Sequence, residues 1–191
     1  YGPYKFVVID DAHQLTTEAS NGLLKMLEEP LPGAILILIT SQPQQLLSTI
    51  RSRCQATQFL PHERSVIEAT LKAKRADPDI INLLSTTADG RLGWAIQMLE
   101  SGTTGEVQAA IRDFQKLTQQ GIAARMQYAK KLVDKENHLT TVDYWLRWLH
   151  GRMDQHPRTP SVIRDLLHVH YIISQPQYNH RLALESFLLK L

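Results

Sequence analysis

The sequence predicts an α/β region followed by an all-α region, and three observations support this division. Residues 1–60 alternate short apolar runs typical of strands with helical patterns. From residue 61 onward the strand patterns stop, and only amphipathic helical patterns remain. Proline, glycine and other turn residues divide these patterns into short segments, as in a helical bundle.

The α/β region begins with an apolar strand over residues 5–9, which runs into two adjacent acids, Asp10 and Asp11. A helix follows in residues 16–29, with Thr16 or Thr17 as its N-cap. The pattern therefore brings a strand, two carboxylates and a capped helix together within the first 30 residues.

The rest of this region repeats the alternation. Residues 34–40 are continuously apolar, as expected for a strand buried on both faces of a parallel sheet, and end in Thr40 followed by Ser41. A short helix is predicted within residues 42–53, and alternating residues 54–59 suggest an edge strand. This order is typical of βαβ units.

Three helices are predicted within residues 61–100, and SGTTG at 101–105 is the best candidate for a linker. Four or five amphipathic helices then fill residues 106–191. The predicted domains are residues 1–60, 61–102 and 106–191.

The composition describes a chain that can bury a core. The 191 residues are 43% hydrophobic, with a net charge of +2. Residues 106–191 hold 12 basic and 8 acidic side chains, an excess too small for a dedicated nucleic-acid-binding stripe. No run reaches the roughly 18 apolar residues of a membrane span, so no membrane partner is expected. The single cysteine, Cys54, excludes an internal disulfide and is consistent with a cytoplasmic location.

An apolar strand that ends in acids has two interpretations. Carboxylates at the carboxyl ends of parallel strands can hold Mg²⁺ bound to nucleotide phosphates, as in a Walker B motif. An Asp after a strand is more often a turn or capping residue. Asp10 and Asp11 alone leave both interpretations open.

Two longer stretches extend the pattern. ASNGLLKMLEEP at 19–30 and LLSTIRSRC at 46–54 follow the FVVIDD strand in this order. Together they resemble the clamp-loader branch of the AAA+ ATPases, and within it the subunits of the bacterial DNA polymerase III clamp loader. The resemblance is strongest over residues 5–59 and weakest in the middle of the bundle, and residues 179–191 again look like the last helix of such a subunit.

The resemblance implies a role for each domain. Residues 1–60 would be the C-terminal part of an AAA+ core, 61–102 a helical lid, and 106–191 a helical collar through which subunits assemble into a ring. The chain starts without Met and almost at once with a strand, so we expect it to be part of a longer protein. A phosphate loop and a possible zinc module would then lie upstream of residue 1.

The resemblance also implies site residues. Arg53 corresponds to the family's arginine that reaches into the ATP site of a neighbouring subunit. Without its neighbours Ser52 and Cys54, this side chain would be read as a surface cation at a helix C-terminus. The degenerate nucleotide and magnesium site would consist of Asp10, Asp11, Thr40 and Ser41.

Two departures weaken the hydrolytic machinery. Active relatives have Glu at the position of Asp11, and the shorter side chain withdraws the carboxylate by about 1 Å, enough to impair positioning of the attacking water. They also have a lid arginine where this chain has Gly93; Arg91 lies two residues too early to substitute on a helix.

These observations predict a clamp-loader subunit without ATPase activity of its own, a stator that donates Arg53 to ATP and Mg²⁺ held by a neighbour. Its partners would be the other loader subunits, the sliding clamp and primer-template DNA. One alternative is an active AAA+ ATPase motor subunit of the same complex. Another is a helical adaptor with a vestigial α/β core and no ring partners.

Overall fold

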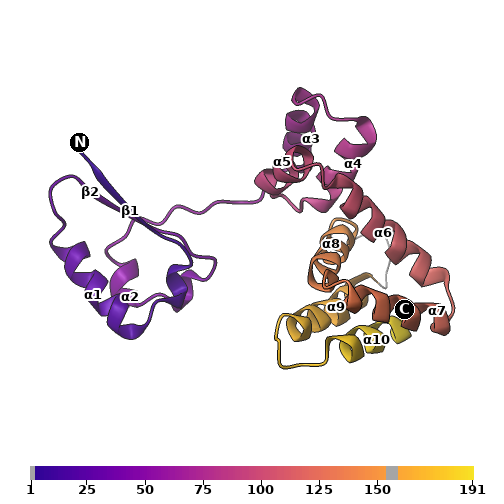
Figure 1. Cartoon of the computed structure of the whole chain (residues 1–191). Helices are drawn as coiled ribbons and strands as arrows, with labels where there is room; N and C mark the ends of the chain where they lie inside the picture. The colour runs from indigo at the N-terminus through magenta and orange to yellow at the C-terminus, as the bar shows by residue number, and fades with distance from the viewer. Residues whose placement is uncertain (1–2, 154–158) are drawn as a thin grey trace. The chain divides into compact units, whose positions relative to one another are not determined.

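A computed structural model describes residues 3–153 and 159–191 (Figure 1). The chain divides into two compact units, Tyr1–Phe59 and Leu60–Leu191. The first is α/β and the second is entirely helical among its described residues, which confirms the predicted fold class. No helix in the described ranges is long and apolar enough to cross a membrane.

The first unit contains a parallel two-stranded sheet. Strand β1 (Lys5–Ile9) pairs with β2 (Ala34–Leu38) in a register that places Ile9 opposite Leu38. Figure 1 shows the helical segments of this unit on one side of the two strands. They are η1 (Ala12–Gln14), α1 (Thr17–Glu28), η2 (Pro43–Gln45) and α2 (Ser48–Arg51).

Helix α1 begins where the sequence predicts. The hydroxyl oxygen of Thr16 accepts a hydrogen bond from the backbone N–H of Ala19 at 3.2 Å, which satisfies one of the free donors of the first turn. Glu18 lies in that turn, and its pKa is lowered by a backbone hydrogen bond and by Thr16. Leu23 is buried on the inner face of the helix.

The predicted burial of the second strand on both faces is wrong for this chain. Alternate residues of β2 are exposed, and Phe6 of β1 retains 64% of its accessible surface. The reason is that the sheet has two strands and the helices of this unit lie on one side of it, so no described element of the unit covers the other face (Figure 1).

The strand predicted over residues 54–59 is also wrong. Residues 55–63 form neither helix nor strand, and Phe59 is 92% exposed. Alternation of apolar and polar residues is insufficient here, because a strand also needs a partner to receive its backbone hydrogen bonds. No described segment pairs with it.

The second unit follows the predicted helical pattern, with boundaries shifted by a few residues. Only residues 101–103 of the SGTTG segment lie between helices, in a tight turn with Gly102 at a φ of 71°, and Thr104 and Gly105 begin the next helix. The helices are α3 (Arg64–Ala73), α4 (Pro78–Thr87), α5 (Leu92–Glu100), α6 (Thr104–Gln119), α7 (Ile122–Asp134), α8 (His138–His150), α9 (Thr159–Ile173) and α10 (His180–Lys190).

Two hydrophobic clusters stabilise this unit. The smaller joins α3, α4 and α5, and the larger joins α6 to α10 around Trp145, whose indole N–H donates to the carbonyl of Ala110 at 2.8 Å. Trp94 and Met98 pack against both clusters. The division of this unit into a lid and a collar remains a prediction.

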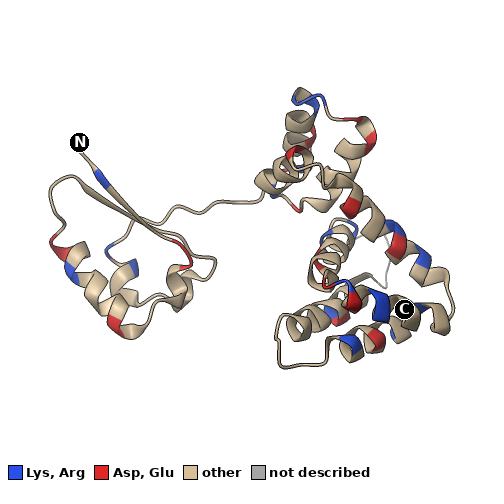
Figure 2. Ribbon diagram, viewed as in Figure 1, with Lys and Arg blue, Asp and Glu red and all other residues tan. Residues whose placement is uncertain are grey.

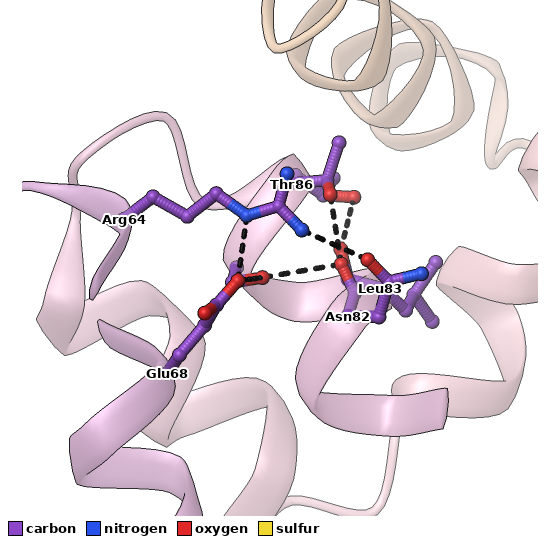
Figure 3. Close-up of polar contacts among 7 residues, drawn as sticks. Arg64, Glu68, Asn82, Leu83 and Thr86 are labelled. Atoms are coloured by element: carbon purple, nitrogen blue, oxygen red, sulfur yellow. Dashed lines mark hydrogen bonds and ion pairs between the residues drawn. The ribbon is translucent and has the colours of Figure 1, made fainter. Parts of the chain in front are cut away.

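A polar network fastens α3 to α4 (Figure 3). The guanidinium of Arg64 donates to the carboxylate of Glu68 at 2.7 Å and to the side-chain oxygen of Asn82 at 2.8 Å. Ser85 donates to the same Glu68 oxygen at 3.2 Å. The Arg64 and Ser85 hydrogen bonds lower the pKa of the Glu68 carboxyl.

Candidate functional site

The parallel register places the polar ends of both strands at one edge of the sheet. Because Ile9 lies opposite Leu38, the residues that follow β1 and β2 emerge together. Two backbone bonds hold the turns beside each other: the Ile39 N–H donates to Ile9, and the Ala12 N–H donates to Ile39, both at 2.9 Å. This edge carries Asp10, Asp11, His13, Thr40 and Ser41.

The two acids differ in their local bonding. One carboxylate oxygen of Asp10 accepts the backbone N–H of Asp11 at 2.9 Å, which stabilises the turn after β1. Asp11 has φ 46° and ψ 43°, a left-handed conformation that Asp and Asn tolerate better than most residues. Both side chains are exposed. Asp10 therefore acts as a turn residue. The second oxygen of its carboxylate remains available to a cation.

Thr40 is tied into the edge by two contacts. Its hydroxyl oxygen accepts the backbone N–H of Gln42 at 3.0 Å and lies 3.1 Å from Nδ1 of His13. Ser41 is exposed. No local sequence pattern points to this contact of His13. The signal for its partner is positional, since both residues lie just past the ends of adjacent parallel strands.

Mg²⁺ prefers carboxylate oxygens, waters and phosphates as ligands. Asp10 and Asp11 are the carboxylates at this edge. Among residues 3–153 and 159–191, no group of three or more His, Cys, Asp or Glu side chains is arranged to hold a metal ion. Any Mg²⁺ here would need oxygen ligands from nucleotide phosphates and water, and this role for the two acids remains a prediction.

Arg53 lies just after α2, and its contacts are separate from those of the strand edge. Its Nη1 atom donates to the carbonyl of Thr49 at 3.0 Å, and its Nη2 atom lies 2.8 Å from a carboxylate oxygen of Glu28 at the end of α1. The Arg53 side chain keeps 38% of its surface exposed. The contact with the Thr49 carbonyl is what a surface cation at a helix C-terminus would make. The role of Arg53 at a neighbouring ATP site remains a prediction.

The segment that lacks the lid arginine begins α5. Arg91 is the N-cap residue of this helix, and Gly93 lies in its first turn. A Cβ atom added at Gly93 would meet no atom within 4 Å. The structure therefore leaves room for a side chain at this position.

The chain is similar to subunits of DNA polymerase III. Residues 1–63 match the family described as "DNA polymerase III, delta subunit". The chain is 36% identical to DNA polymerase III subunit delta' of Bacillus subtilis over 107 residues, which are 56% of this chain and 32% of that protein. It is 32% identical to the delta' subunit of Haemophilus influenzae over 148 residues, which are 76% of this chain and 44% of that protein.

A second type of subunit matches as well. The tau subunit of DNA polymerase III from Bacillus subtilis is 31% identical over 105 residues, which are 51% of this chain and 18% of that protein. The chain therefore spans less than half the length of each of these three relatives.

Proposed function

The chain is a homologue of the DNA polymerase III clamp-loader subunits delta' and tau, and we propose that it acts as a non-hydrolysing stator of a bacterial clamp loader. In this role it assembles with other loader subunits and supplies Arg53 to the ATP site of one neighbour during sliding-clamp loading. Its location would be the cytoplasm, where the replication machinery of bacteria works.

The observation that carries the proposal is the state of Arg53. A guanidinium that neutralises charge on a transferring phosphoryl group must be accessible to a second molecule and held in a defined orientation. Arg53 combines partial exposure with contacts to Thr49, Ser52 and Glu28. The Thr49 and Ser52 contacts belong to the end of α2, and the Glu28 contact adds an anchor on another helix that a helix-end arginine alone would not need.

We propose that the chain does not hydrolyse ATP because two of its residues differ from those of active relatives, and no other residue that the structure describes takes over their roles. The side chain of Asp11 is one methylene shorter than that of the Glu that orients water in active relatives, and its backbone has a left-handed conformation. The first turn of α5 carries Gly93 in place of a phosphate-contacting arginine. A nucleotide bound in this chain would lack both contributions to transition-state stabilisation.

Assembly is proposed to use the helical unit. Leu167 and Tyr171, one turn apart on α9, are 54% and 62% exposed. Apolar side chains at this spacing form a stripe suited to a partner helix. A stator must make such contacts, because it acts only through its neighbours.

Contact with primer-template DNA and with the clamp is proposed for the assembled complex. Figure 2 shows Lys and Arg interspersed with Asp and Glu along the helices of the second unit. A protein that binds DNA on its own gathers basic side chains on one face. This chain would therefore contribute to DNA binding through its place in a ring.

The similarity to tau supports a second candidate, an active AAA+ motor subunit. The full-length protein with its partner subunits separates the two. A stator shows no ATP turnover when isolated, and Arg53→Ala lowers turnover of the assembled complex. A motor subunit hydrolyses ATP itself and loses turnover when Asp10 is changed to Asn.

A further inference from the structure

Arg53 lies between the C-terminal ends of two helices. Glu28 is the last residue of α1, and Thr49 belongs to α2, whose free carbonyls lie at its end. The guanidinium of Arg53 donates to the Thr49 carbonyl at 3.0 Å on one side and lies 2.8 Å from the Glu28 carboxylate on the other. Two anchors on different helices therefore restrain one planar group.

Glu28 lies at a position where an acid destabilises its own helix. The C-terminal end of a helix carries partial negative charge, so an acid in the last turn is unfavourable unless a cation compensates it. The cation is Arg53, which follows the end of α2 and is brought to Glu28 by the packing of α1 against α2. The next residue, Glu29, is exposed and does not pair with Arg53. Of these two adjacent acids, only Glu28 lies within ion-pair distance of the guanidinium.

The contacts leave part of the guanidinium available. Arginine has five N–H donors in a rigid fork. Nη1 donates to the Thr49 carbonyl and, at 3.4 Å, to the Ser52 hydroxyl, and Nη2 lies beside Glu28, while Nε has no partner among the described residues. The Glu28 and Arg53 side chains are 52% and 38% exposed, so their ion pair is weak enough to coexist with or yield to a phosphate.

We propose that Glu28 is a positioning residue for Arg53, and this inference rests on the proposed role of Arg53 at a neighbouring ATP site. The carboxylate holds the guanidinium in the orientation set by Thr49 before a nucleotide arrives. The reaction then does not have to order a flexible side chain, which raises the rate of the chemical step. Glu28 acts only through Arg53 and does not touch the nucleotide.

The test uses the full-length protein in its complex with partner subunits. Glu28→Ala should lower kcat for ATP about threefold to tenfold with KM for ATP and complex assembly unchanged. Glu28→Gln should restore kcat to within about twofold of wild type, since an amide oxygen at the same reach can still accept from Arg53. Glu29→Ala is the matched control and should leave kcat unchanged. In an Arg53→Ala background, Glu28→Ala should have no further effect.

The outcomes separate this inference from the proposed function. If Arg53→Ala lowers kcat but Glu28→Ala leaves it unchanged or raises it, Glu28 does not position the arginine and the inference is overturned alone. A full Glu28→Ala defect in the Arg53→Ala background would overturn it as well, because Glu28 would then act elsewhere. If Arg53→Ala itself has no effect, the proposed function and the inference fall together.

Discussion

Nε2 of His138 lies 2.9 Å from Nδ1 of His180, so a hydrogen bond joins the first residue of α8 to the first residue of α10. Nε2 of His180 lies 3.0 Å from the carbonyl oxygen of Gln175 and must donate to it. Neutral His180 therefore accepts at Nδ1 and His138 donates. Nδ1 of His138 is then an acceptor, buried and without a partner among the described residues.

This geometry predicts that stability falls in mild acid. A proton added to Nδ1 of His138 would be buried without an acceptor among the described residues. Burial, and then the charge of His180, lower the pKa of His138, while Glu136 opposes them. The unfolded chain therefore binds more protons at His138 than the folded chain does. The contribution of neutral His138 to stability is complete above about pH 6.5 and is lost as the pH falls below it.

Thermal unfolding between pH 8 and 5.5 measures this effect in a range where most carboxyl groups do not titrate. The melting temperature of wild type should fall with decreasing pH, and His138→Gln should flatten the slope. His168→Gln removes an exposed histidine of α9 and should keep the wild-type slope. Equal slopes for wild type and His138→Gln would show that the pair does not control the response.

Arg125 is predicted to stabilise the bundle by capping the ends of two helices. Its guanidinium donates to the carbonyls of Leu117 at 2.9 Å and Thr118 at 3.4 Å, at the end of α6, and to that of Leu188 at 3.2 Å, at the end of α10. Arg125→Ala removes the donor of the Thr118 and Leu188 carbonyls and leaves that of Leu117 with only the backbone N–H of Gln120 at 3.3 Å, so it should cost about 2 kcal/mol of unfolding free energy in urea. Arg112→Ala, an exposed change on α6, should cost less than about 0.5 kcal/mol. Equal costs would refute the capping role.

Asp11→Asn should leave ATP turnover of the assembled complex within about twofold of wild type, because no water is positioned by this carboxylate. Asn suits the left-handed backbone at this position, so the change tests the charge without straining the turn. Steady-state ATP hydrolysis measures the result. A loss of tenfold or more would identify this chain as a hydrolysing subunit.

The double change Leu167→Glu and Tyr171→Glu should reduce co-purification with partner subunits at least fivefold. Both side chains are exposed on α9, so the fold should tolerate the change while the charges oppose an apolar contact. Ile122→Glu, at an exposed position on α7 of the same bundle, is the control and should still bind. Deletion of α10 is less informative, because Leu184, Phe187 and Leu188 are part of the core. Undiminished binding of the double variant would place the assembly surface elsewhere.

Local signals allowed much of the fold to be predicted. The Thr16 cap, the strand before Asp10 and the helical periodicity after residue 61 depend on neighbouring residues, and the structure contains each of them. Residues 54–59 were predicted wrongly because a strand depends on a distant partner. The contacts His13–Thr40 and Glu28–Arg53 could not be predicted either, because they also depend on distant partners. Their members are 27 and 25 residues apart in sequence and meet only through the packing of the first unit.

The most direct test of the stator role is a double-mutant cycle on ATP turnover of the reconstituted complex. Arg53→Ala should leave assembly intact, since an exposed side chain at a helix end contributes at most about 1 kcal/mol. Arg53→Lys should restore little, because lysine lacks the planar fork. A second mutation that empties the phosphate loop of the neighbour facing Arg53 should add almost nothing, while one at a distant site should compound the loss. Fully additive effects at the neighbour, or unchanged turnover with Arg53→Ala, would contradict the account.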